Sequence, residues 1–269
     1  MESQIVKDLI KFYQAYNHSE VLKLIEKDID LKKFKILKDK YYKIYIPIKL
    51  EKPVPMLCVH TDTVFPHIPE AFSMKKGRLS CKNKGIGLGA DDRNGCYLIH
   101  RMMQQRPDDF IFAVFDLEEL GCLGSRSLNL FPIKELVSIF IGLDRKGSNE
   151  FALYNYESEE LLKLLDTFPN YHVDFGSITD CAVLAEESNI CCFNLSVGFY
   201  NQHTSKEFTV VRDLLRAEKF LLNLPGEFWG KQYLVDYIFD DQMLEYDCYD
   251  SFPDFLRTSP FKKGGSHAK

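Results

Sequence analysis

The stretch that decides the fold of this chain is Gly85-Ile86-Gly87-Leu88-Gly89-Ala90-Asp91-Asp92-Arg93-Asn94-Gly95. A glycine-rich loop here leads into two adjacent carboxylates, and the apolar periodicity that follows predicts a helix over residues 94–103. Aspartate is common where helices begin, so Asp91 and Asp92 have a simple structural explanation as a cap and a first-turn residue. A functional explanation is favoured because other predicted elements end in similar side chains.

Uninterrupted apolar segments alternate with amphipathic ones along the chain. The apolar segments predict buried strands over residues 56–59, 110–115, 137–143 and 190–197. The amphipathic segments predict helices over 3–16, 159–168 and 179–187, and a strand followed by a helix over 207–222. Buried strands separated by helices are typical of a mainly parallel sheet that is covered on both faces, which predicts a three-layer αβα fold. We also expect a half-buried strand over 40–48, a hairpin over 72–84 and an edge strand over 149–156.

The predicted strands end in side chains that bind metals or move protons. In chain order these are His60, Asp62, Glu118, Glu119 and Asp144, with His203 a few residues after the last strand. The carboxyl ends of parallel strands meet at one edge of the sheet, where ligands bind. With Asp91 from the glycine-rich loop, we expect five acids and two histidines to converge at that edge.

Length and composition limit what else the chain can be. Its 269 residues and 45% hydrophobic content suit one sizeable domain, predicted over residues 1–224. An acidic, aromatic extension over 225–262 is expected to pack on or near that domain, and residues 263–269 are expected to be disordered. The net charge of -5 argues against nucleic acid as a partner, and no apolar run approaches the length of a membrane span. Eight cysteines without paired spacing are predicted to be reduced, which favours a cytoplasmic location.

Several carboxylates at one sheet edge cannot all stay ionised without a counter-charge. No arginine cluster lies near these positions, so divalent cations are the expected source. Mixed carboxylate and imidazole ligands suit zinc, with cobalt or manganese as substitutes. Two ions that share one carboxylate need about five protein ligands. The sequence supplies His60 and Asp144 for one ion, Glu119 and His203 for the other, and Asp91 as the bridge.

The two remaining acids have predicted roles beside these ligands. Asp62 follows His60 by two residues in an extended segment, so it lies on the same side and can hold the other imidazole nitrogen. Glu118 is adjacent to Glu119 and is placed to take a proton from a water between the ions. Both are therefore predicted to be catalytic residues.

Taken together, these segments resemble the co-catalytic zinc exopeptidases, the group that includes peptidase T, glutamate carboxypeptidase and the zinc aminopeptidases that lack a lid. The resemblance rests on segments 59–64, 89–95, 115–121, 143–144, 176–180 and 198–207, which follow the family's order. It implies that Asp91 bridges two metal ions, that the Asp91–Asp92 bond is cis, that Glu118 is the general base and that Glu119 is a ligand.

One departure from the family concerns its inserted lid or dimerisation domain. Many members carry it after the position of Asp144, whereas Asp180 follows here after only 36 residues, so we expect the insertion to be absent and the chain to be a monomer. In those members the lid stabilises the oxyanion and grips the substrate carboxylate. Tyr200 or the metals are candidates for the first role, and Arg93, Arg145 and Lys146 for the second.

Three functions agree with these residues. The leading hypothesis is a di-zinc metallopeptidase, most simply an aminopeptidase or exopeptidase that acts on short peptides. The second is a deacylase or amidase that acts on a small non-peptide amide with the same chemistry. The third is a metal-stabilised scaffold without catalytic activity that binds a partner through the aromatic extension.

Overall fold

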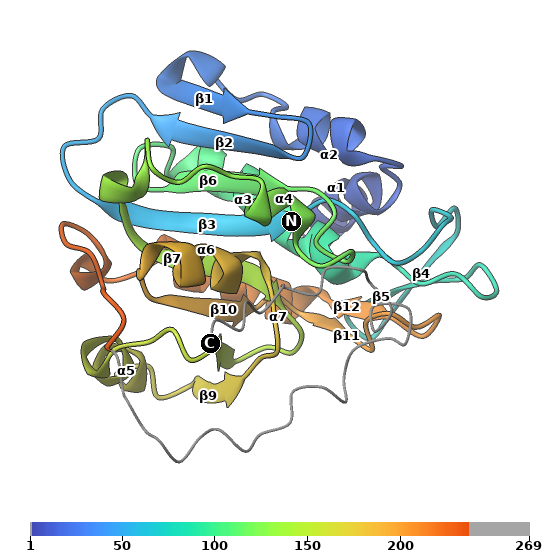
Figure 1. Ribbon diagram of the computed structural model, residues 1–269. Helices are drawn as coiled ribbons and strands as arrows, with labels where there is room; N and C mark the ends of the chain where they lie inside the picture. The colour runs from blue at the N-terminus through green and yellow to red at the C-terminus, as the bar shows by residue number, and fades with distance from the viewer. Residues whose placement is uncertain (1, 237–269) are drawn as a thin grey trace, which may run out of the picture. The chain divides into compact units, whose positions relative to one another are not determined.

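The computed structural model describes residues 2–236 of the chain. Its main sheet has eight strands and runs from β1 at the top of Figure 1 to β9 near the bottom. The spatial order is β1 (Phe34–Lys38), β2 (Tyr42–Pro47), β6 (Ile111–Phe115), β3 (Val54–His60), β7 (Val137–Arg145), β10 (Cys192–Ser196), β8 (Glu150–Leu153) and β9 (His172–Phe175).

The centre of this sheet is parallel, as predicted. Strands β6, β3, β7 and β10 pair in parallel, while β1, β2 and β8 add antiparallel pairs. The predicted edge position of residues 149–156 is wrong, because β9 pairs in parallel with β8 and takes the edge. Strand β9 is exposed along its whole length, so it has no apolar pattern that would reveal it in the sequence.

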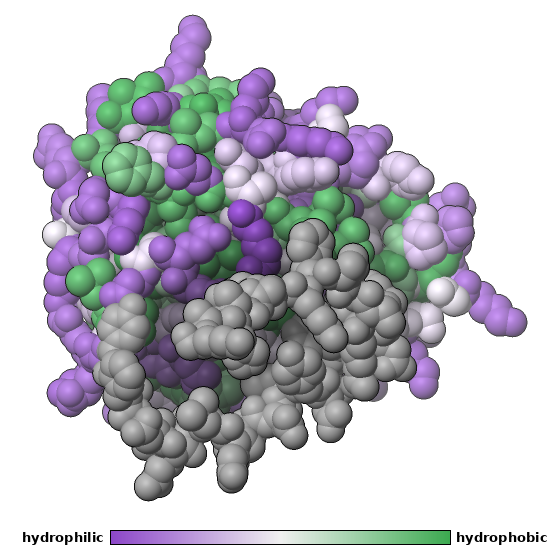
Figure 2. Space-filling model, viewed as in Figure 1, coloured by the Kyte–Doolittle hydropathy of each residue, from purple (hydrophilic) through white to green (hydrophobic). Residues whose placement is uncertain are grey.

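Helices cover both faces of the sheet, which makes the three predicted layers (Figure 1). One face packs against α1 (Glu2–Tyr13), α2 (His18–Ile25), α3 (Ala90–Gln105), α5 (Glu159–Asp166) and α7 (Val211–Leu222). The other face packs against α6 (Asp180–Ser188), beside which lies the short α4 (Leu123–Arg126). Single 3-10 turns occupy Leu31–Lys33, Lys134–Leu136 and Gly226–Phe228. Polar side chains interrupt the hydrophobic areas on the surface seen in Figure 2.

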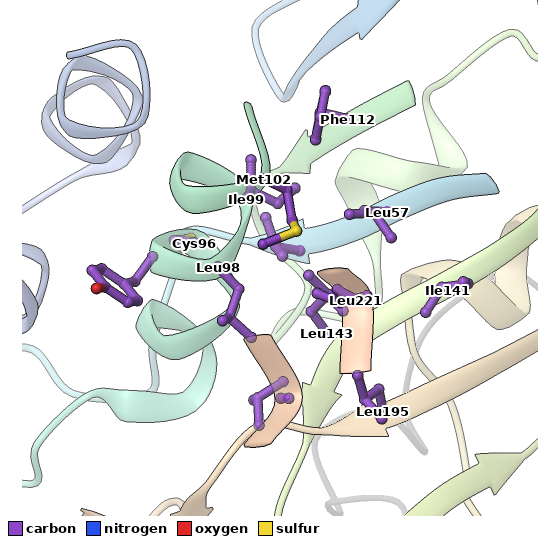
Figure 3. Packing of buried hydrophobic residues seen from close by; sticks show 14 of the residues in the cluster. Leu57, Cys96, Leu98, Ile99, Met102, Phe112, Ile141, Leu143, Leu195 and Leu221 are labelled. Carbon is purple, nitrogen blue, oxygen red and sulfur yellow. The ribbon is translucent and has the colours of Figure 1, made fainter. Parts of the chain in front are cut away.

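Strand β3 contributes side chains to the hydrophobic cores on both faces of the main sheet. Its side chains alternate, so Leu57 and Val59 enter the core under α3 while Met56 and Cys58 enter the core under α6. Figure 3 shows the first core, where α3 packs over Leu57, Leu143 and Leu195 from three neighbouring strands. Burial of each leucine side chain contributes about 1.5–3 kcal/mol. This packing holds α3 against the carboxyl ends of the central strands.

A second, smaller sheet stands beside the main one and carries part of the candidate site. Its order is β11 (Phe199–Tyr200), β12 (Phe208–Val210), β5 (Arg78–Cys81) and β4 (Phe72–Lys75), all antiparallel. The β4–β5 pair confirms the hairpin predicted over 72–84. Because β12 pairs with β5, the turn between β11 and β12, which contains His203, is brought beside the segment that leads into α3.

The first part of the predicted C-terminal extension packs on the domain. The Trp229 indole donates to the Asp109 carbonyl at 2.8 Å, and the Tyr233 amide donates to the Ser138 carbonyl at 2.9 Å. Residues 225–236 therefore belong to the compact unit, whereas the rest of the extension and the predicted tail lie outside the described residues. The cysteines within residues 2–236 are free thiols. Over the same range, no helix combines the length and the apolar character that crossing a bilayer requires.

Candidate active site

The centre of the site is the Asp91 carboxylate, which lies between two imidazoles. Its Oδ1 is 3.2 Å from Nε2 of His60 at the end of β3. Its Oδ2 is 3.2 Å from Nε2 of His203 in the β11–β12 turn. Each oxygen therefore faces a different histidine, and the two histidines come from opposite ends of the sequence of the domain.

One further acid lies on each outer side of this arrangement. Glu119, in the loop after β6, has its Oε1 3.1 Å from the same nitrogen of His203. Asp144, near the end of β7, has its Oδ1 3.6 Å from Nε2 of His60. The structure thus brings together all five residues predicted as metal ligands, from strands β3 and β7, the start of α3, the loop after β6 and the β11–β12 turn.

Asp62 connects the first histidine with the two glutamates. Its Oδ1 lies 3.2 Å from Nδ1 of His60, and its two oxygens accept hydrogen bonds from the backbone N–H groups of Glu118 and Glu119, at 3.0 and 3.1 Å. Asp62 therefore holds both the imidazole and the turn that carries the glutamates. The Glu118 carboxylate itself comes within 3.9 Å of Nε2 of His60.

The Asp91–Asp92 bond is cis, as the family resemblance implies. The two side chains have different surroundings. The Asp92 carboxylate is fully buried and accepts hydrogen bonds from the backbone N–H groups of His60 at 3.3 Å and of Gly95 at 2.9 Å. Asp92 also lies within ligand distance of His60 and Asp144, but it does not line the pocket that contains Asp91. These contacts favour Asp91 as the shared ligand and give Asp92 a role in the backbone geometry.

Glu207, directly before β12, was not among the predicted site residues. Its buried carboxylate accepts hydrogen bonds from the backbone N–H groups of Gly89, at 2.5 Å, and Asp91, at 3.1 Å. Glu207 therefore holds the glycine-rich loop in the position that presents Asp91. The only sequence signal was its place at the end of the last segment of the family resemblance.

Burial and crowding perturb the protonation of the site. Burial, and next the negative charge of Asp91, raises the pKa of Asp144 to about 8. Burial also raises the pKa of Glu118 well above its ordinary value, with Asp144 adding to the effect. Burial alone would lower the pKa of His60, but the surrounding carboxylates outweigh it and hold that pKa well above its usual range. The nearby carboxylates of Asp91 and then Glu119 raise the pKa of His203 to about 10. Burial and mutual repulsion therefore oppose ionisation of Asp144 and Glu118, in agreement with the expectation that these carboxylates need a counter-charge.

These residues fit a divalent metal. The ligand atoms of His60, Asp91 and Glu119 lie within 4.8 Å of one another. The buried Oε1 of Glu119 also accepts no hydrogen bond from any described residue, although His203 is near it. A buried carboxylate oxygen without a donor is costly unless a cation neutralises it. Imidazole and carboxylate groups at such distances can hold a zinc-type ion.

A pocket opens over this centre, and not every predicted substrate residue lines it. Arg145 and Lys146 are at its wall, with Glu118, Thr179 and Gln202. Arg145 is already paired with Glu150, at 2.9 Å, and with Asp174.

Arg93 and Tyr200 are not lining residues of this pocket. The Arg93 guanidinium is buried and donates to the backbone carbonyls of Thr61 and, at 3.0 Å, Ala15. The Tyr200 hydroxyl donates to Asp213 at 2.8 Å. The structure therefore does not bring these two side chains into contact with the centre.

Tyr154 and Asn194 are lining residues that the sequence did not reveal. Tyr154 directly follows β8, and Asn194 lies in β10. Burial raises the pKa of the Tyr154 hydroxyl well above its ordinary value, so the hydroxyl keeps its proton. In the sequence, Tyr154 is one of 14 tyrosines and looks like a core residue.

Comparison with known proteins identifies the fold. No family model and no curated protein matches the sequence. Among solved structures, aminopeptidase PepT from Bacillus cereus is similar with a TM-score of 0.65 and 14% identity, over 82% of this chain and 97% of that one. The chain has the fold of the co-catalytic zinc exopeptidases.

Two other peptidases of this fold show the same degree of similarity. A tripeptidase from Staphylococcus aureus has a TM-score of 0.64 and 14% identity, over 82% of this chain and 97% of that one. The TET1 peptidase from Pyrococcus horikoshii has a TM-score of 0.61 and 14% identity, over 81% of this chain and 98% of that one. The resemblance inferred from the sequence motifs is therefore confirmed for the fold.

Proposed function

We propose that this chain is a metal-dependent aminopeptidase that hydrolyses short peptides with a free amino end. The observation that carries the proposal is the Asp91 carboxylate, with one oxygen facing His60 and the other facing His203, each at 3.2 Å. A carboxylate that two metal ions share would lie in this way, with one imidazole available to each ion. The aminopeptidases among the structural neighbours support the direction of cleavage.

We assign the metal ligands as the sequence predicted them. His60 and Asp144 would hold one ion, Glu119 and His203 the other, and Asp91 both, with zinc as the expected metal and cobalt or manganese as substitutes. When bound, the two ions supply positive charge that makes a water more acidic and polarises the scissile carbonyl.

The side chains around this centre carry the proton transfers. Glu118 takes a proton from the attacking water and passes it to the nitrogen of the leaving amine, so one carboxylate serves as base and then as acid. Its backbone is held by Asp62, which also fixes the His60 imidazole. The Asp62 carboxylate therefore fixes the position of the base Glu118 relative to the proposed ligand His60.

The carboxyl end of a short substrate needs a cation at the pocket. Arg145 is engaged by Glu150 and Asp174, and Arg93 is buried away from the pocket. Lys146 lines the pocket and, within residues 2–236, has no carboxylate in salt-bridge contact. We therefore assign the carboxyl end of the substrate to Lys146 rather than to either arginine.

The proposed form is the short one, without the lid. Between β7 and α6 the chain contains only β8, α5 and β9 as regular elements. We propose that the protein acts as a monomer, although the TET1 peptidase among its structural neighbours assembles into a tetrahedron or a large octahedral shell.

The Glu118→Gln variant tests the mechanism. It keeps the shape of the side chain but removes the base, so kcat on an unblocked tripeptide should fall about 100- to 10,000-fold. Metal content, measured by mass spectrometry, should stay equal to that of the unmodified protein. The exposed Glu135 provides a matched Glu135→Gln control with unchanged kcat. Unchanged kcat in Glu118→Gln would show that Glu118 is not the general base.

The same assay separates the aminopeptidase from the deacylase. A peptidase that needs a free amino end should not cleave the N-acetylated form of the same tripeptide. Preference for the acetylated form would instead establish the deacylase. Absence of turnover on both, with tight metal binding, would leave the scaffold hypothesis.

A further inference from the structure

Tyr154 lines the same pocket as Glu118 and several of the proposed metal ligands. The side chain is 9% exposed, and it lines the pocket together with Asp91, Glu118 and Asp144. Tyr154 directly follows strand β8, which joins the sheet on the far side of β10. Tyr154 has no role in the proton transfers assigned to Glu118. No side chain has yet been assigned as hydrogen-bond donor to the oxygen of the substrate carbonyl.

Asn194 fixes the direction in which this hydroxyl can donate. The Asn194 Oδ1 accepts the backbone N–H of Asp144 at 2.8 Å, which identifies the other end of the amide as the nitrogen. That nitrogen donates to the Tyr154 oxygen at 3.2 Å. The tyrosine oxygen is therefore an acceptor toward Asn194, and its own hydrogen has to point elsewhere.

Among the described residues, nothing accepts that hydrogen. The Asn194 amide makes the one hydrogen bond to the Tyr154 hydroxyl that the described part of the chain provides. A hydroxyl that accepts a hydrogen bond is also a better donor, because the two bonds polarise each other. The hydroxyl therefore has a hydrogen available for donation, on a side chain that lines the pocket.

The tyrosine ring is held in place by the loop that crosses it. A Cβ at Gly176 would lie 2.3 Å from the Tyr154 ring and 2.8 Å from its hydroxyl oxygen, so only glycine permits this contact. Farther along the same loop, the Thr179 hydroxyl donates to Asp144 at 3.4 Å. The loop therefore contacts both the ring and a proposed metal ligand, which limits movement of the hydroxyl relative to the site.

We propose that the Tyr154 hydroxyl donates a hydrogen bond to the oxygen of the scissile carbonyl as that oxygen becomes negatively charged. Asn194 is the positioning residue that orients it. The O–H bond stays intact, because the proton transfers belong to Glu118. This inference rests on the proposed peptidase function and gives Tyr154 the role for which Tyr200 was the sequence candidate; the Tyr200 hydroxyl instead donates to Asp213. A preoriented donor of this kind acts mainly in the transition state.

Tyr154→Phe tests the inference with the full chain loaded with zinc. The change removes one oxygen atom and leaves the ring against Gly176, so kcat on an unblocked tripeptide should fall about 100- to 1,000-fold. KM should change little, because the bond strengthens only as charge develops. Tyr156→Phe is the matched control, since Tyr156 lies two residues further along and does not line the pocket.

A second measurement does not depend on turnover. A phosphinic peptide analogue with a free amino end mimics the tetrahedral state, and calorimetry should show it binding to Tyr154→Phe more weakly by a factor similar to the loss of kcat. Equal analogue affinity together with a kcat within about threefold of the unmodified enzyme would overturn the role of Tyr154. If the unmodified protein hydrolyses no peptide, the proposed function fails as well. The two failures are therefore distinguishable.

Discussion

Glu207 offers the sharpest test of how the site is held together, because its carboxylate touches no substrate. It accepts the backbone N–H groups of Gly89 and Asp91 at 2.5 and 3.1 Å and is 1% exposed. A hydrogen bond to a charged group contributes about 1.5–3 kcal/mol. Glu207→Gln keeps one acceptor oxygen and turns an NH2 group toward the other N–H, so it loses one of the two bonds.

The expected loss is thus about 1.5–3 kcal/mol of unfolding free energy for Glu207→Gln and about twice that for Glu207→Ala. Urea denaturation of the metal-free proteins at pH 8 measures it, since burial and then the charge of Asp91 raise the pKa of Glu207 to about 7 and the carboxylate is charged at this pH.

Metal binding should weaken in parallel. Release of the Asp91 backbone would disturb the proposed shared ligand, and loss of such a supporting contact lowers metal affinity about 10- to 100-fold. Competition with a chromogenic chelator measures the zinc affinity, with the exposed Glu135→Gln as control. Unchanged stability in Glu207→Gln, within about 0.5 kcal/mol, together with unchanged zinc affinity would show that Glu207 does not position Asp91.

Two further predictions concern the packing of the site and its metals. Gly95→Ala places a Cβ 2.4 Å from the Leu143 carbonyl, so we expect a loss of about 1–3 kcal/mol in urea denaturation despite the better helix propensity of alanine. Gly226→Ala meets nothing within 4 Å and is the control; equal stability of the two variants would contradict the predicted clash. Removal of metal by a chelator should abolish peptide hydrolysis and lower the melting temperature, because the crowded carboxylates lose their counter-charge. Zinc, cobalt or manganese should restore both, and full activity in the demonstrably metal-free protein would exclude the metal mechanism.

Local patterns predicted the central parallel strands and the residues that follow them. Strands β3, β6 and β7 are largely apolar, and an acid or a histidine lies at the end of each one or within a few residues after it. Parallel pairing brings such ends to one edge of the sheet without further information. For this reason His60, Glu119 and Asp144 could be placed together before their contacts were known.

The tertiary structure alone decided which charged and polar groups serve the site. Glu207 contacts Gly89 across 118 residues of sequence, and Asn194 contacts Tyr154 across 40. Conversely, Arg93 directly follows the Asp91–Asp92 pair, yet its guanidinium is bound to the carbonyls of Ala15 and Thr61. Apolar periodicity is a local property that determines which face of a strand or helix is buried. The hydrogen-bond partner of a buried polar group depends on which distant segment the fold brings beside it. The residues that neighbour the group in the sequence therefore do not predict that partner.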